Sequence, residues 1–320
     1  MKKPDQPEKS LLVQPVIDAL LDTSRIFPAR YISFFSDISD EGLKAVKDVW
    51  PLISIERKVA LLSDLEEAME TDSLLSFDDL AKFALEDNEA EVRSRAISLL
   101  WESKDAKFLE KLCGLLASDP SDMVKIAAAA GLGRFVLMGE LDEVPKKSQD
   151  LAISALRQKQ LEKAHKEIQQ EILKSLAYQA TSEINRQIEL AKKDTDTTWQ
   201  LAAIIAMGRT ADERWETDIL DAMDSQITAI QNEAVKAAGE IEMESARLPL
   251  LDMIETGISD LELRMHVIWA LARIGGEDVK ETLNHLLDDA EDEEEIEVIE
   301  MALEHLEFSE ELPDLDLDDF

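Results

Sequence analysis

The sequence predicts an all-α protein, an α-solenoid in which antiparallel helix pairs stack into one right-handed superhelix without a β-sheet. A similar segment recurs along the chain at steps of 31 to 44 residues, a spacing typical of repeat solenoids. Each copy carries an apolar stripe at helical spacing, which a single helix could not bury alone. The 320 residues are 45% hydrophobic and include only ten Gly and nine Pro, a composition that favours helices.

The recurring segment is clearest in DNEAEVRSRAISLLWE, residues 87–102, where an acidic turn precedes a Val-Arg pair. We take the Val of this pair as the anchor of the repeat. The six anchors are Val92, Val124, Ile168, Trp199, Ile230 and Leu263. They are separated by 32, 44, 31, 31 and 33 residues, and weaker copies lie near Ile55 and Ile296.

Columns of the aligned copies indicate a buried helix face. The columns four, five and eight residues after the anchor are apolar, as the first copy shows with Ala96, Ile97 and Leu100. The column nine residues after the anchor holds Gly133, Gly208 and Gly239. Because Gly inside a helix costs about 1 kcal/mol relative to Ala, we expect a neighbouring helix to approach closely at this column.

The turns before the anchor helices carry a recurrent acid. An Asp stands five residues before three anchors, at Asp87, Asp119 and Asp194. Its carboxylate can accept backbone N–H bonds in the turn. We therefore expect these side chains to hold the turns in place.

Second helices are predicted between the anchor-bearing first helices. Their sequences are DAKFLEKLCGLLAS, SEINRQIELAKK, WETDILDAMDS, ARLPLLDMIE and EDVKETLNHLLDD. Each repeat is therefore a helical hairpin whose apolar faces are covered only by the neighbouring repeats.

The predicted boundaries follow from where this pattern starts, stretches and stops. We expect a polar tail at 1–10, a solenoid at 11–308 with an atypical cap at 11–51 and repeats at 52–306, and an acidic tail at 309–320. The acidic tail is either a solvated terminus or a docking motif.

The 44-residue step in the middle of the chain predicts a longer loop at 136–150. Gly139 and Pro145 fall in this stretch, and both residue types interrupt helices. Loops lengthen at little energetic cost, so the insertion is a tolerated one, a functional loop or a bend in the superhelix.

The repeat resembles HEAT repeats, especially the short bacterial kind that phycobilin-lyase-like HEAT proteins share. The resemblance is carried by DNEAEVRSRAISLL, DPSDMVKIAAAAGLG and DLELRMHVIWALARIGG, and it covers about residues 52–306. It implies an armadillo-type α-solenoid. Because HEAT arrays are mostly binding scaffolds and only a few are enzymes, the resemblance specifies the fold far better than the function.

The charge of the chain restricts its partners. Against 34 Lys and Arg stand 70 Asp and Glu, so the net charge is −36. Such a polyanion repels nucleic acid and anionic lipid alike, so we expect neither nucleic acid nor a membrane as partner. A protein or peptide partner should be basic or apolar.

No run approaches 18 apolar residues and no signal-peptide pattern opens the sequence, which indicates a cytoplasmic protein.

The sequence contains no group of residues that would carry catalysis. It has no Gly-rich phosphate loop and no Cys pair at zinc spacing. The single Cys113 lies among apolar residues, which favours a core thiol. None of the four His is followed by Glu, whereas the HEAT-repeat iron hydroxylases resemble one another through His-Glu pairs. We therefore expect no enzyme activity, metal or cofactor, and the oligomeric state stays open.

The exposed face of the first helices is the predicted binding surface. Positions three, six and ten after each anchor share this face and carry mixed chemistry, which indicates solvent or a partner rather than core. In the HEAT arrays that the chain resembles, this face lines the concave side. The predicted partner-binding residues are Tyr178, Ile205, Arg209, His266, Trp269 and Arg273.

Some of these residues have a structural alternative. Trp269 is either a contact anchor or a ring packed flat against the neighbouring repeat. Arg134, Arg209 and Arg273 fall near predicted helix C-termini, where they would compensate the helix dipole. Gripping an acidic peptide is their alternative role.

The sequence thus predicts a non-enzymatic cytoplasmic scaffold that binds a protein or peptide along its concave face. The alternative is an enzyme, or a lyase-like or chaperone-like accessory protein, with a small ligand or chromophore in the groove. A metal or chromophore that copurifies with the protein would favour this alternative.

Overall fold

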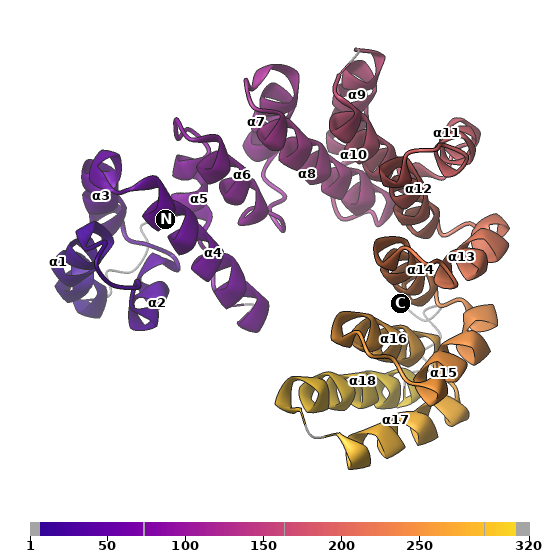
Figure 1. Cartoon of the computed structure of the whole chain (residues 1–320). Coiled ribbons are helices and arrows are strands. Elements are labelled where there is room, and N and C mark those ends of the chain that lie inside the picture. The colour runs from indigo at the N-terminus through magenta and orange to yellow at the C-terminus, as the bar shows by residue number, and fades with distance from the viewer. Residues whose placement is uncertain (1–6, 73, 163, 291, 312–320) are drawn as a thin grey trace, which may run out of the picture. The chain divides into compact units, whose positions relative to one another are not determined.

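The chain is all-helical in the part that the computed structural model describes, residues 7–72, 74–162, 164–290 and 292–311. For residues 7–11, 277, 294 and 309–311 the description covers the backbone alone. Eighteen α-helices and five short 3-10 turns make up its regular structure, and none of the described residues lies in a β-strand (Figure 1). The predicted α-solenoid of paired helices is confirmed.

The chain divides into two compact units, the first ending at Ser175 and the second beginning at Leu176. The helices of the first unit are α1 Pro7–Leu21, α2 Ile32–Phe35, α3 Asp40–Val49, α4 Ile55–Thr71, α5 Asp78–Ala84, α6 Ala90–Ser98, α7 Ala106–Ser118, α8 Asp122–Glu140, α9 Lys146–Leu161 and α10 Lys166–Leu176, whose last residue opens the second unit. The helices of the second unit are α11 Ser182–Lys192, α12 Thr197–Thr210, α13 Glu216–Met223, α14 Thr228–Glu240, α15 Arg247–Thr256, α16 Leu261–Ile274, α17 Glu277–Asp289 and α18 Glu293–Glu311.

The second unit consists of two layers of helices. The first helices α12, α14, α16 and α18 pack side by side in chain order, and the second helices α11, α13, α15 and α17 cover one side of them. In the first unit α4, α6 and α8 pack in the same way, and α7 and α9 pack on α8. All five predicted second helices are present, as α7, α11, α13, α15 and α17.

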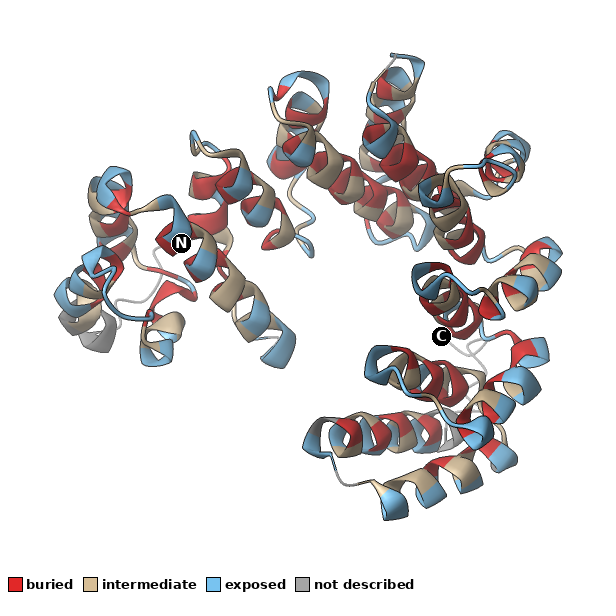
Figure 2. Ribbon diagram, in the orientation of Figure 1, coloured by how far each residue is buried: buried red, intermediate tan, exposed pale blue. Residues whose placement is uncertain are grey.

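The apolar columns of the repeat form the core of both units. All six residues four positions after the anchors, from Ala96 to Val267, have no exposed surface, and Ile268 in the next column is equally buried. The buried residues lie on the sides of the helices that face one another (Figure 2). The anchor Trp199 is only half-buried, whereas the other five anchors are buried.

Successive first helices approach each other closely at the glycine column. A Cβ atom added to Gly239 of α14 would lie 2.7 Å from the Cα atom of Ala270 in α16. One added to Gly208 of α12 would lie 2.8 Å from the Cβ atom of Ala237 in α14. In the first unit, Gly133 meets Ser175 in the same way. The sequence prediction for this column is confirmed: a side chain here would push the neighbouring helix away.

The recurrent Asp holds the turn before each first helix. Asp87, Asp119 and Asp194 each accept a hydrogen bond from the backbone N–H two residues later, at 2.8–2.9 Å. This is the arrangement that the sequence predicts for these positions.

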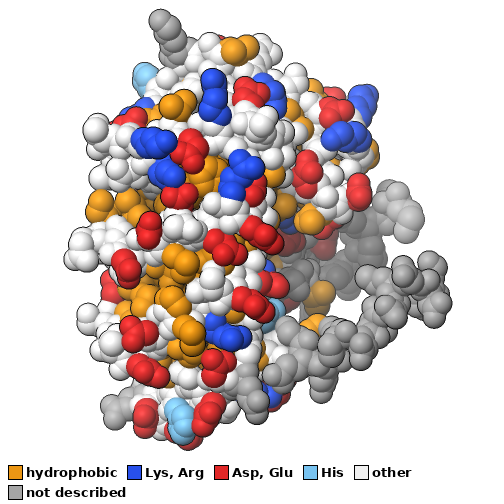
Figure 3. Space-filling view, turned by 90° about the vertical axis from the view of Figure 1, so that its right-hand side faces the viewer, with side chains coloured by type: hydrophobic (Ala, Val, Ile, Leu, Met, Phe, Trp, Pro, Cys, Tyr) orange, Lys and Arg blue, Asp and Glu red, His pale blue; other side chains and the backbone are white. Residues whose placement is uncertain are grey.

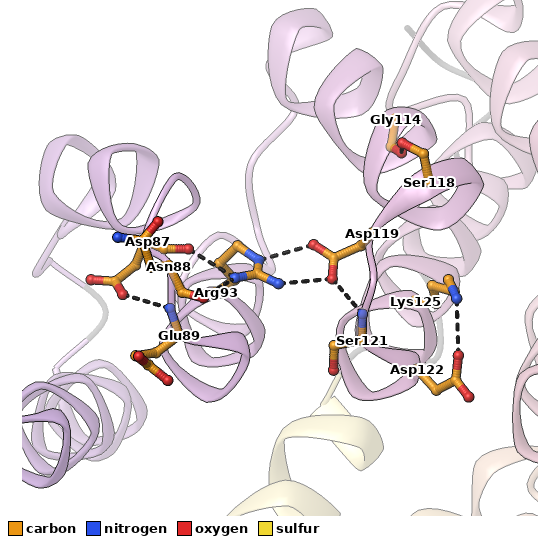
Figure 4. Close-up of polar contacts among 10 residues, drawn as sticks. All are labelled: Asp87, Asn88, Glu89, Arg93, Gly114, Ser118, Asp119, Ser121, Asp122 and Lys125. Carbon is orange, nitrogen blue, oxygen red and sulfur yellow. Dashed lines mark hydrogen bonds and ion pairs between the residues drawn. The ribbon is translucent and has the colours of Figure 1, made fainter.

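Arg93 links two of these turns to each other (Figure 4). Its Nε and Nη2 atoms donate to the two carboxylate oxygens of Asp119 at 2.9 and 2.8 Å, and its Nη1 donates to the carbonyls of Asp87 and Asn88. In the preceding repeat, the Nζ atom of Lys58 in α4 donates to a carboxylate oxygen of Asp87 at 2.9 Å. The cation of the Val-Arg pair thus serves the fold: it joins one turn to the next.

The region predicted as a longer loop at 136–150 is mostly helical, so that prediction is wrong. Helix α8 continues to Glu140, and α9 begins at Lys146, directly after Pro145. The buried side chain of Gln149 reaches back to donate to the carbonyl of Val136 at 3.2 Å. The extra residues of the 44-residue step therefore lengthen two packed helices, and Gly139 makes room for Gln149 between them.

The predicted ends of the solenoid also shift. Residues 7–10 belong to α1 instead of a tail, and residues 309–311 belong to α18. The remainder of the two predicted tails, 1–6 and 312–320, lies outside the described residues.

The cap at 11–51 is helical, with an aromatic cluster in which the ring centroids of Phe34 and Phe35 are 5.3 Å apart. Cys113 is half-buried, and burial raises the pKa of its thiol.

A charged side chain in the fifth column should unfold the second unit. We expect Ile268→Asp to lower the free energy of unfolding by at least about 3 kcal/mol, because an unpaired carboxylate would enter the core. Hydrogen exchange should report lost protection in α14, α16 and α18, with α6 and α8 protected as before, since repeats couple chiefly to their neighbours. Ile205→Asp, at a half-buried site of the same layer, is the control and should cost less. Unchanged urea unfolding of Ile268→Asp would contradict this core.

The Arg93–Asp119 pair should make stability depend on acid. Burial would raise the pKa of Asp119, but hydrogen bonds from Arg93 and from the Ser121 N–H outweigh it, so the pKa lies below its ordinary value. A lowered pKa stabilises the fold above about pH 4, and this contribution is lost as the pH falls through the lowered value.

Removing the Arg93 cation should leave a buried carboxylate that destabilises the fold until acid protonates it. We expect Arg93→Met to cost about 3 kcal/mol at pH 7, because Asp119 stays buried without its partner, and the difference from the parent should shrink below about pH 4 as Asp119 is protonated. Urea unfolding between pH 3 and 8 measures both effects. Lys111→Met breaks a more exposed pair with Glu86 and should cost less than about 1 kcal/mol. An equal loss in the two variants would contradict the role of Arg93.

Candidate functional site

The predicted binding residues all lie in the second unit, on the first-helix layer and the turn before it. Ile205 and Arg209 belong to α12, and His266, Trp269 and Arg273 to α16. Tyr178 lies in the 3-10 turn Ala177–Gln179, called η3, which packs on α12. We call this surface, with the residues of α14 between them, the Trp269 face.

Arg209 and Tyr178 contact each other. The Cζ atom of Arg209 is 5.1 Å from the centroid of the Tyr178 ring, a geometry worth about 0.5–1 kcal/mol near a surface. Arg209 lies in the last turn of α12, as the sequence predicts. Its cation is therefore engaged within the fold.

Arg273 is bound to the neighbouring repeat. Its Nη2 atom donates to the backbone carbonyl of Glu240, the last residue of α14, at 3.2 Å and lies 3.5 Å from a carboxylate oxygen of Glu242. A cation at this place compensates the negative end of the α14 dipole. Arg273 therefore has a helix-end role, but at the end of α14 and not of its own helix α16. For Arg134 the prediction is wrong, because α8 continues six residues beyond it to Glu140.

The carboxylate of Glu240 lies between these two arginines. Its Oε2 atom would be 3.5 Å from a Cβ added to Gly208, so it folds back over α12. Loss of solvent raises the pKa of Glu240 and repulsion from Glu233 adds to the rise, while Arg209 and Arg273 oppose it. Arg209 and Arg273 thus both act on the Glu240 carboxylate electrostatically, from α12 and α16 on either side of α14.

The surroundings of His266 favour its neutral ring. Burial lowers its pKa and the nearby Lys236 adds to this, while Glu262, Glu233 and Asp260 act in the opposite direction. Its Nδ1 atom is buried and has no hydrogen-bond partner among the described residues. His266 therefore contributes a half-buried imidazole ring to the face.

Trp269 is the large apolar side chain that stays open on this face. It is 39% exposed, and its ring centroid lies 5.5 Å from that of His305 in α18, with the rings tilted by 41°. The ring therefore stands against the next repeat without lying flat on it. Because Ile205 is only half-buried on α12, the face offers two apolar side chains among engaged charges.

The described residues hold no arrangement typical of a metal centre or a membrane anchor. Nowhere in them do three or more His, Cys, Asp or Glu side chains converge as metal ligands. None of the described helices combines the length and apolar character that crossing a membrane requires.

The structure also shows a groove in the first unit that the sequence prediction missed. Two adjoining hollows of about 430 and 490 Å³ lie where α4 and α6 end, and they share Met69, Leu75, Leu99 and Glu102. Trp101, 44% exposed, lines the first of them. A signal was present in the sequence: Trp101 stands nine residues after the anchor Val92, in the column that holds Gly in three other copies.

The second-helix layer presents a different surface. Figure 3 views the side of the molecule on which these helices lie, where apolar side chains gather among many carboxylates. Leu190 of α11 and Leu248 of α15 are 64% and 69% exposed. A hollow of about 550 Å³ between α15 and α17 is lined by Asp252, Glu255, Asp278 and Glu281 beside Leu248. No aromatic side chain other than His285 lines it, which distinguishes it from the Trp269 face and the Trp101 groove.

Three solved structures align with most of this chain, at low sequence identity and low TM-score. Human deoxyhypusine hydroxylase, in complex with glycerol, is 14% identical over 95% of this chain and 100% of that one, with a TM-score of 0.37. The Escherichia coli protein YibA is 14% identical over 96% of this chain and 99% of its own, with a TM-score of 0.40. An engineered protein is 18% identical over 95% and 92%, with a TM-score of 0.36.

The family itself is shown by the sequence. A search of curated protein sequences found no significant match. The family model described as HEAT repeats matches residues 77–158 and 216–304, which together make up more than half of the chain. These stretches contain the buried columns of α6, α8, α14 and α16 and the turn bonds of Arg93. The chain belongs to the HEAT-repeat family.

Proposed function

We propose that this protein is a non-enzymatic binding scaffold whose Trp269 face holds a protein or peptide segment. The observation that carries this proposal is the open indole of Trp269, which stands beside His305 on a face where the other large side chains are engaged. A half-exposed Trp set among polar groups is the kind of residue that dominates binding energy in protein interfaces.

The apolar side chains, rather than the arginines, supply the grip. Arg209 already contacts the Tyr178 ring, and Arg273 already donates to the last backbone carbonyl of α14. Lys236 pairs with Glu233 on α14 at 3.0 Å. A partner that used these cations would first have to break bonds within the fold, so it would gain little from them.

The charge of the whole chain sets the remaining chemistry of the partner. At −36, the protein repels an acidic segment before it reaches the face. We infer that the partner segment is neutral or basic and inserts an apolar side chain against Trp269 and Ile205. Because this contact is apolar, it should persist at salt concentrations that screen surface charges.

Removing the indole should therefore abolish most of the binding. We expect partners that stay on the immobilised protein at about 0.5 M salt, where charges are screened within a few Å, to bind Trp269→Ala roughly thirtyfold more weakly, the equivalent of 2 kcal/mol or more. Partners would be captured from native extract, identified by mass spectrometry and then titrated as purified proteins against each variant. Leu248→Ala removes a 69% exposed apolar side chain from the second-helix layer and should bind as the parent does.

Three results would contradict the proposal. One is parental affinity in a Trp269→Ala protein whose circular dichroism and unfolding match the parent. Another is a loss of binding only when residues 309–320 are removed, which would transfer the role to the acidic tail. The third is a metal or chromophore that copurifies with the protein and is released by Trp269→Ala, which would favour a small-ligand function.

A further inference from the structure

Trp101 breaks the rule that lets successive first helices pack. The column nine residues after the anchor holds Gly208 in α12 and Gly239 in α14, where even one added carbon would meet the next helix. An indole at this column cannot enter such a contact. Trp101 is instead turned outward and is 44% exposed.

The backbone of α6 changes at the same place. Helix α6 ends at Ser98, six residues after its anchor, whereas α12, α14 and α16 end ten or eleven residues after theirs. After Ser98 the chain continues in tighter turns, in which the N–H of Leu100 donates to the carbonyl of Ile97 and that of Trp101 to Ser98. The missing helical turn leaves space beside the end of α4.

This space is the groove described above, here called the Trp101 groove. Its first hollow, of about 430 Å³, is lined by apolar Met69, Leu75 and Leu99 and by the indole of Trp101. The second, of about 490 Å³, continues over Leu74, which is 88% exposed. A groove of this size accommodates side chains of an extended segment.

Most charges along the groove are already paired. Glu66 accepts from Arg95 at 3.2 Å, and Lys82 lies 2.9 Å from Asp78 and 3.5 Å from Asp105. Each of these carboxylates is therefore compensated within the protein.

Two carboxylates next to Trp101 are not compensated. Lys104, at the far end of the groove, pairs with Glu143 at 2.9 Å. Glu70 and Glu102 line the same hollow as Trp101, and neither has an ion-pair partner among the residues that the structure describes. The first hollow thus combines an open aromatic ring, an apolar floor and two unpaired negative charges.

We propose that the Trp101 groove binds an arginine-bearing segment of a partner protein. A guanidinium is planar, stacks on an indole and donates to carboxylates at the same time, so it satisfies Trp101, Glu70 and Glu102 together. Its methylene stem fits the apolar floor of Met69 and Leu75. Lysine lacks the planar group, and a phosphate or an acidic side chain would be repelled. The groove belongs to the first unit, so this proposal stands independently of the Trp269 face.

The experiment uses the full chain and two synthetic peptides as probes. One is acetyl-Gly-Leu-Arg-Arg-Leu-Gly-amide, and the other carries neutral citrulline in place of both arginines. In protein labelled with ¹⁵N at tryptophan, the five tryptophans give five indole N–H resonances, and Trp101→Phe identifies that of Trp101. We expect the arginine peptide to shift the Trp101 resonance in a saturable manner and to leave that of Trp269 in place, and the citrulline peptide to bind about tenfold more weakly.

Variants separate the charges from the ring. Glu70→Gln/Glu102→Gln should weaken the arginine peptide about tenfold, whereas Glu67→Gln, an exposed glutamate of α4 outside the groove, should bind as the parent does. With a fluorescent peptide, Trp101→Phe should retain most of the affinity and Trp101→Gly should lose it.

The proposal would be overturned if the two peptides bound equally, since the site would then not select a cation. It would also fail if the arginine peptide shifted only other indole resonances, or if the double glutamine variant matched Glu67→Gln. Should Trp101→Gly fail to fold, the glutamine variants and the peptide pair still decide the matter.

Discussion

Successive first helices approach so closely that a methyl group on Gly239 would lie 2.7 Å from the Cα atom of Ala270. This backbone contact sets the spacing of the second unit, because Gly208 and Ala237 repeat it one step earlier. The contact also determines which residues of the first helices are exposed to solvent. Each first helix packs against its neighbours and against the second helices, so only a narrow strip that includes Trp269 stays accessible. Where Trp101 replaces the glycine, α6 ends early and a groove lies beside the indole.

The scarce cations of this acidic chain are used mainly to hold its own parts together. Arg93 and Lys58 are buried on the carboxylates of successive turns. Arg209 and Arg273 hold η3 and the end of α14. Because cations are outnumbered by carboxylates, acids remain without partners, and two of them, Glu70 and Glu102, lie beside the open indole of Trp101. We therefore expect acidic ligands to be disfavoured at either surface.

The repeat itself could be predicted from sequence in detail, because its signals are local or periodic. The anchors, the buried columns, the turn-holding Asp residues and the close contact at Gly239 follow from spacing and residue type alone. The loop predicted at 136–150 was wrong because Gly139 and Pro145 are ambiguous. Each interrupts a helix in isolation, yet Gly139 admits the side chain of Gln149 between two helices, and Pro145 immediately precedes α9.

The sequence by itself determined the helix pairs, the columns that pack and the family. The reason is that apolar periodicity is a property of each segment and can be recognised without knowing which segments contact one another. Only the tertiary structure decided what the surface residues do. Arg273 reaches a carbonyl in the preceding repeat, Trp269 meets His305 in the next one, and Glu70 shares a hollow with Trp101 from another helix. These relations join residues about thirty positions apart, and their distances and burial are set by how closely two helices pack, which no single segment encodes.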